Sequence, residues 1–97
     1  MTLKQIEYFQ MVCEKGNISA AAEALFVSRS VVSRTIADIE ETFGAPVFVR
    51  SKTGVTLTEC GKIVARLFGT FTDNYAAALD RIDQIKKETE VRRCPSA

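Results

Sequence analysis

The feature of this sequence that most constrains its fold is a long segment near the C-terminus, residues 59–90, in which almost nothing interrupts a helix. Thr58 is a suitable N-cap for it, and Glu59 stands favourably in the first turn. Its apolar residues recur at alternating steps of four and three, namely Val64, Phe68, Phe71, Tyr75, Ala78, Ile82 and Ile85. Such a heptad seam is typical of a helix that pairs with another helix. We therefore expect a dimerisation helix here.

Packing within the same chain is the alternative explanation of the seam. A second apolar stripe, Ile63 and Leu67, is expected to hold the beginning of this helix against the rest of the chain. One helical face cannot account for all of these apolar positions, and a chain of 97 residues buries only a modest share of its surface. These points favour self-association. Beyond the helix, residues 91–97 are expected to form a flexible tail.

Two short helices and a longer one are predicted ahead of this segment. The spacing of Thr2 and Gln5 predicts a capping box at the start of the first helix. Ser19 is the expected N-cap of a short second helix, and Ser28 caps a third that runs to Phe43. Two helices joined by a tight turn form the outline of a helix-turn-helix.

The third predicted helix has two different faces. Its inward face is apolar and comprises Val32, Ile36, Ile39 and Phe43. Its outward face comprises Arg29, Ser30, Ser33, Arg34 and Ala37. One helix fits the major groove of DNA, where an arginine can bind guanine or grip a phosphate. An ordinary solvated face is the alternative, but the position between a second helix and a hairpin favours DNA.

A small hairpin is predicted after the third helix. Residues 47–50 and 55–57 form its strands, and residues 51–54 form its turn. Because two strands are not stable alone, the hairpin must rest on the helices, as a wing does. Arg50, Lys52 and Thr53 cluster where a wing would meet the DNA backbone or minor groove, although a solvated basic turn has the same charge. Ser19, at the start of the second predicted helix, is suited to bind a phosphate as well as to cap the helix.

Composition excludes several function classes. The net charge is only +1, so any charge evidence for nucleic acid is local to residues 28–37, which hold two arginines and no acid. Without histidine, and with Cys13, Cys60 and Cys94 far apart, we expect reduced thiols and neither a metal site nor a cofactor. No catalytic constellation, secretory signal or membrane span is visible, so we expect a cytoplasmic protein that is not an enzyme.

Four segments of the chain resemble the LysR-type transcriptional regulators of bacteria. They are "LKQIEYF" at 3–9, "AAEAL" at 21–25, "VSRSVVSRTIADIEETFGAPVFVR" at 27–50 and "LTECG" at 57–61. The resemblance implies a mainly α winged helix-turn-helix with a small β-hairpin and an antiparallel pair of linker helices. It also implies binding to interrupted palindromes in promoters. By position it implies DNA contacts from Ser19, Arg29, Ser30, Ser33, Arg34, Thr35, Arg50, Lys52 and Thr53.

Three departures from the family pattern bear on function. Arg29-Ser30 stands where the family typically has Gln-Pro, so base preference is expected to differ there. Ala20 occupies a position that is often arginine, which removes a phosphate contact. The chain stops where the family begins its effector-binding domain, so no small-molecule effector is expected on this polypeptide.

Together these observations predict a DNA-binding domain over 1–58, a linker and dimerisation helix over 59–90 and a tail over 91–97. The expected function is sequence-specific transcription regulation by a homodimer on double-stranded DNA at the nucleoid, with higher oligomers in a full-length form. The alternative is a protein-interaction form that makes mixed dimers with a full-length regulator through the linker helix. No membrane partner is expected.

Overall fold

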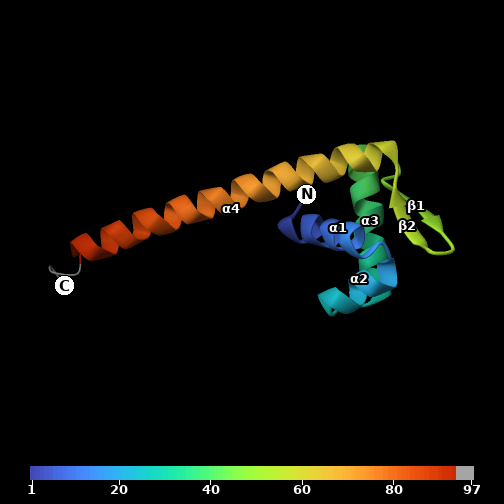
Figure 1. The fold of residues 1–97 in the computed structure, drawn as a ribbon, viewed down its shortest axis with the longest axis horizontal. Coiled ribbons are helices and arrows are strands. Elements are labelled where there is room, and N and C mark those ends of the chain that lie inside the picture. The colour runs from blue at the N-terminus through green and yellow to red at the C-terminus, as the bar shows by residue number, and fades with distance from the viewer. Residues whose placement is uncertain (94–97) are drawn as a thin grey trace.

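The computed structural model describes residues 1–93 of the chain. The elements in chain order are α1 (Leu3–Lys15), α2 (Ile18–Leu25), α3 (Arg29–Phe43), β1 (Phe48–Ser51), β2 (Gly54–Leu57) and α4 (Glu59–Arg93). Figure 1 shows a small body made of α1 to α3 and the hairpin, from which α4 extends as a long arm. The expected fold class, mainly α with one small antiparallel hairpin and a long C-terminal helix, is confirmed.

Local capping determines where α1 begins and ends. The amide of Gln5 donates to Thr2 Oγ1 at 3.2 Å, and the amide of Thr2 donates back to Gln5 Oε1 at 3.0 Å. Gly16 ends the helix in the left-handed region, with φ +67°. The two hydrogen bonds between Thr2 and Gln5 confirm the predicted capping box.

The start of α2 differs from the prediction. Its N-cap is Asn17, not Ser19: Asn17 has an extended backbone, and its Oδ1 accepts a hydrogen bond from the amide of Ala20 at 2.9 Å. The helix begins at Ile18 because that side chain is buried in the core, which draws the first turn inward. Ser19 is consequently an exposed residue of the first turn. At α3, the predicted cap Ser28 is confirmed, with the amide of Val31 donating to its Oγ at 3.3 Å.

The core is built around Phe9 of α1. The centroid of its ring lies 5.1 Å from the centroid of the Phe68 ring, in an edge-on arrangement, and 5.1 Å from that of the Phe48 ring. The predicted inward face of α3 packs here through Val32, Ile36 and Ile39, which are all buried. Phe43 is the exception: it lies on the rim and is exposed, with its ring 6.2 Å from that of Phe68.

The first turns of α4 present a different face to the body from the predicted one. Val64 and Phe68, expected in the dimer seam, are 4% and 2% exposed and belong to the core of their own chain. Ile63 and Leu67, expected to hold the helix on the body, are instead 68% and 53% exposed. The predicted roles of the two stripes are therefore wrong at this end of the helix.

Gly61 is the physical reason for this rotation of α4. A Cβ built on Gly61 would lie 2.0 Å from the carbonyl oxygen of Val47, so only glycine allows the helix to approach so closely on this side. Val64 and Phe68 follow Gly61 at helical spacing and are turned inward with it. Close contact at one glycine thus decides which stripe is buried.

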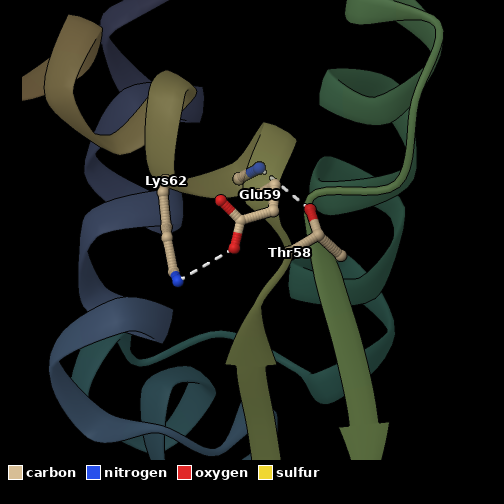
Figure 2. A network of polar contacts seen from close by, with 4 residues as sticks. Thr58, Glu59 and Lys62 are labelled. Atoms are coloured by element: carbon tan, nitrogen blue, oxygen red, sulfur yellow. Dashed lines mark hydrogen bonds and ion pairs between the residues drawn. The ribbon is translucent and has the colours of Figure 1, made fainter.

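Thr58 joins α4 to the strand region (Figure 2). Its Oγ1 accepts from the amide of Gly61 at 2.9 Å. The same hydroxyl donates to the carbonyl oxygen of Pro46 at 2.6 Å. An exposed ion pair between Lys62 Nζ and Glu59 Oε1, 3.2 Å apart, lies beside this cap. The predicted cap at Thr58 is confirmed, and it also anchors the segment that precedes β1.

Strand β1 is shifted by one residue from the predicted 47–50, and β2 begins one residue before the predicted 55–57. Strand β1 begins at Phe48. The preceding residue, Val47, is fully buried, and the carbonyl oxygen of Val47 accepts a hydrogen bond from the amide of Thr58 at 3.0 Å. Ser51 pairs with Gly54, so Lys52 and Thr53 form the turn. The amide of Val55 donates to the carbonyl oxygen of Gly16 at 2.9 Å, which attaches the hairpin to the loop between α1 and α2.

Most of α4 makes no contact with the core. From residue 70 to residue 89 every side chain is exposed, and the molecule measures 63 × 26 × 19 Å as a result. The helix was expected over 59–90 and extends to Arg93. The rest of the expected tail, 94–97, lies outside the described residues, as does Cys94, whereas Cys13 and Cys60 are free thiols. Within residues 1–93 no helix has the length and apolar character needed to cross a bilayer.

Candidate nucleic-acid interface

The outward face of α3 is presented to solvent on a rigid support. Arg29, Ser30 and Arg34 are exposed, and the opposite side of the same helix is buried in the core. The ion pairs seen among residues 1–93, Lys62–Glu59 and Lys87–Asp83, both lie on α4. The guanidinium groups of α3 are therefore available to a ligand outside the chain.

A shallow hollow runs along this face. It is lined by Ser30, Val31, Arg34, Thr35 and Asp38. The hydroxyl of Thr35 donates to the carbonyl oxygen of Val31 at 2.9 Å, so its hydrogen is already engaged within the helix. Thr35 can then offer only an acceptor and a methyl group outward.

A second hollow joins the N-terminus of α2 to the hairpin. Its lining is strongly polar and includes Ser19, Arg29, Arg50 and Lys52, three of which are cations. Asn17, Ile18, Ser51, Gly54 and Val55 complete it. No acidic residue is among these nine, and the free backbone amides at the start of α2 add partial positive charge. This hollow is suited to an anion.

The close docking of the hairpin creates the second hollow. Gly54 has φ +143°, and a Cβ on it would lie 2.1 Å from the carbonyl oxygen of Gly16. Only glycine permits this approach, which brings the side chains of Arg50 and Lys52 to the start of α2. The wing and α2 are separated by about 30 positions in sequence. The backbone contact at Gly16 and the packing of Phe48 and Val55 on the core bring them together.

The predicted DNA-contacting residues fall into two groups on the surface. Ser30, Arg34 and Thr35 share the hollow on α3, and Ser19, Arg29, Arg50 and Lys52 share the polar hollow. Ser33 and Thr53 line neither: Ser33 is half-buried, and the Thr53 hydroxyl in the turn lies 3.3 Å from Ser51 Oγ.

Val31 and Leu79 are among the exposed apolar side chains that the periodicity of the sequence does not reveal. Val31 lies on the outward side of α3 and is 44% exposed, and Leu79 is exposed on α4. Periodicity places Val31 on neither face of its helix, and Leu79 falls outside the heptad positions. The signal that could have found them is the same in both cases: an apolar residue that the core pattern does not require.

The arm of α4 carries an exposed apolar stripe. Its members are Phe71, Tyr75, Leu79, Ile82 and Ile85, and the rings of Phe71 and Tyr75 stack with centroids 6.0 Å apart. At the root of the arm the stripe adjoins an apolar pocket of about 380 Å³. This pocket is lined by Met1, Thr2, Leu3, Ile6, Phe43, Leu67, Phe68 and Phe71.

Comparison with known proteins places these features in a family. Residues 3–62 match the family described as bacterial regulatory helix-turn-helix protein, lysR family. The HTH-type transcriptional regulator GalR of Pseudomonas putida is 43% identical over 60 residues, which cover 62% of this chain and 15% of that protein. The regulator TdcA of Escherichia coli is 35% identical over 83 residues, 86% of this chain and 27% of that protein. The chain therefore spans less than a third of the length of these relatives.

Solved structures show the same arrangement. The chain is 29% identical to the protein in the crystal structure of a CbnR_DBD–DNA complex, with a TM-score of 0.83 over 89% of this chain and 99% of that one. A structure of Vibrio fischeri DarR in complex with DNA gives a TM-score of 0.82 at 28% identity, covering 90% of this chain and 30% of that one. Both neighbours hold DNA.

Proposed function

Because the chain belongs to the lysR family of bacterial regulatory helix-turn-helix proteins, as a DNA-binding transcription-regulator domain of that type, we propose that two copies joined through α4 bind an interrupted palindromic operator. The observation that carries the proposal is the outward face of α3. It combines two unpaired arginines with short serines on a helix whose other side is buried. The protein would act in the cytoplasm, on the nucleoid.

The α3 helix enters the major groove in this proposal. Recognition helices contact base edges with their first turns, which here hold Arg29, Ser30, Ser33 and Arg34. Arg34 is the best candidate for a base contact, since its guanidinium can bind guanine O6 and N7 together. The serines allow the backbone to approach closely, and Thr35 adds an acceptor at the edge of the contact.

The polar hollow holds the DNA backbone. Its cations and the start of α2 fit one phosphate group, with Ser19, Arg29, Arg50 and Lys52 around it. Thr53 at the tip of the wing lies where the adjacent backbone or minor groove would pass. Such contacts fix the position of the protein on the duplex and carry no direct sequence information.

The exposed apolar stripe of α4 supports the proposal that the protein forms a dimer. Apolar side chains on a helix that nothing covers favour pairing with a second helix. The proposed seam begins at Phe71 and includes Tyr75, Ala78, Leu79, Ile82 and Ile85, while Ile63 and Leu67 extend it toward the body. A two-fold, antiparallel pair would set the two α3 helices on successive half-sites of a palindrome.

A titration of duplex DNA tests the proposal. A selected duplex and a scrambled duplex of the same composition are titrated at two salt concentrations, and anisotropy reports binding. We expect tighter binding to the selected duplex and a fall in affinity with salt for both, because phosphate contacts release counterions. Equal, salt-insensitive affinity for the two duplexes would contradict the proposal.

Mixed dimerisation is a second candidate function. The apolar stripe of α4 is separate from the DNA-facing surface, so it can pair with the linker helix of a full-length relative whether or not DNA is bound. Mixing the chain with such a relative, and following subunit exchange by fluorescence transfer, measures this directly. Tight operator binding by the homodimer with no subunit exchange would contradict the second candidate.

A further inference from the structure

Val31 is an apolar side chain in the first turn of α3 that the core does not use. It is 44% exposed, whereas its neighbour Val32 is fully buried. Valine is a poor helix former because its branched side chain loses freedom against the preceding turn. A half-exposed valine beside a buried one therefore adds little to the helix or the core, and its position on the outward face favours contact with a binding partner.

The surroundings of Val31 are rigid. Its amide donates to Ser28 Oγ at 3.3 Å, and its carbonyl accepts from the hydroxyl of Thr35 at 2.9 Å. Residues three and four positions apart lie side by side on a helix, so Arg34 and Thr35 flank it. Because the Thr35 hydrogen is engaged, no free donor stands on that side of the valine.

Resting on the proposed docking of α3 in the major groove, we propose that Val31 reads the 5-methyl group of a thymine next to a guanine bound by Arg34. The thymine methyl is the apolar group that base pairs display in the major groove, and small apolar side chains contact it. Asp38 lies at the far end of the same hollow, and its negative charge disfavours a phosphate there. The hollow therefore faces base edges in preference to the DNA backbone.

Helix and duplex dimensions place the thymine. Side chains three positions apart on a helix are about 5–6 Å apart at Cβ. Successive bases along a strand are about 3.4 Å apart. The thymine bound by Val31 is thus expected within one or two base steps of the guanine bound by Arg34, once in each half-site.

Replacing thymine by deoxyuracil isolates the methyl group. Deoxyuracil pairs with adenine in the same way and presents the same polar edge, so only the methyl is lost. A duplex is selected from random DNA with the wild-type chain, each thymine is replaced in turn in both half-sites, and anisotropy measures the dissociation constants. At one symmetric pair of positions we expect about fourfold weaker binding per half-site, the effect of one buried methyl group, or about fifteenfold for the dimer.

The Val31→Ala variant gives the second half of the test. It should discriminate between the thymine and deoxyuracil duplexes less than the wild type does, because both γ-methyl groups that pack against the thymine methyl are gone. Val49→Ala is the matched control, since Val49 is 52% exposed on β1 and lies in neither hollow; its preference for thymine should equal that of the wild type. Circular dichroism of each variant confirms that the helices are intact.

Two results would overturn the inference. One is a selected duplex in which no thymine methyl affects wild-type binding, and the other is a thymine preference that is undiminished in Val31→Ala. Failure of the wild type to select any sequence is a distinct outcome, which overturns the proposed function and this inference with it.

Discussion

The amide of Val55 in β2 donates a hydrogen bond of 2.9 Å to the carbonyl oxygen of Gly16, so the hairpin is attached to the loop that precedes α2. This backbone contact, with the packing of Phe48 and Val55 on the core, brings the basic residues of the wing to the N-terminus of α2. The polar hollow proposed to bind phosphate exists only while the two segments remain this close. Its geometry can be tested independently of its charge.

Gly54→Ala is expected to open the polar hollow. The added Cβ would lie 2.1 Å from the carbonyl oxygen of Gly16, and φ +143° strains any residue with a side chain. We expect a loss of about 1–3 kcal/mol in the free energy of unfolding, measured by thermal denaturation, together with weaker DNA binding. Gly69→Ala on α4 is the matched control: nothing lies within 4 Å of the added Cβ, and the change should stabilise the helix by about 0.5–1 kcal/mol. A Gly54→Ala variant as stable as the wild type would refute the close approach.

Arg34→Ala and Lys52→Ala are expected to weaken DNA binding in different ways. If Arg34 binds a guanine, its removal costs about 1–3 kcal/mol on the selected duplex and relaxes the preference at one base pair. Removal of Lys52 should weaken binding to selected and scrambled duplexes alike and lower the salt slope by about one. Anisotropy titrations at several salt concentrations separate the two patterns. The same uniform loss for both variants would show that Arg34 only grips phosphate.

Phe68→Ala and Leu67→Ala should differ although the residues are adjacent. Phe68 is buried against the ring of Phe9, so its truncation is expected to cost about 3–5 kcal/mol in the free energy of unfolding. Leu67 is more than half exposed, so its truncation should change that free energy little in a monomer and should instead weaken self-association. Chemical denaturation and sedimentation measure the two effects. Comparable destabilisation by both changes would contradict the observed rotation of α4.

Charged residues on the exposed stripe should separate the dimer. The double variant Phe71→Glu, Ile82→Glu places carboxylates on the proposed seam, where burial without a partner is unfavourable. We expect a monomer in sedimentation experiments, with helix content retained near the body. Ala76→Glu, an exposed site toward the opposite side of α4, is the control and should leave the dimer intact. A double variant that stays dimeric would assign the contact to another surface.

Much of the fold could be predicted because it depends on local chemistry. Thr2 and Ser28 accept hydrogen bonds from amides three residues ahead, and Gly16 and Gly44 take the left-handed conformation that ends a helix. These interactions lie within one turn, so the residues near each helix end are enough to predict them. Ser19 was wrong as a cap because Asn17 offered the same chemistry two residues earlier and burial of Ile18 decided between them.

The candidate site was predictable only in part. The basic and hydroxyl side chains could be identified from their helix face and turn, but their division into two hollows depends on where the hairpin rests. Val31 could not be assigned from periodicity, because an apolar residue at the edge of a helix face fits the core as well as the surface. Only its exposure in the folded chain shows that it is available to a ligand.

By itself the sequence determined the helices, the caps of α1, α3 and α4, the hairpin and the outward face of α3, since each follows from contacts between residues close together in the chain. Tertiary structure alone decided which stripe of α4 is buried. Both stripes have helical spacing and similar apolar content, so periodicity cannot choose between them. The choice depends on the close approach of Gly61 to the carbonyl of Val47, which sets the rotation of the helix and leaves Ile63 and Leu67 outside.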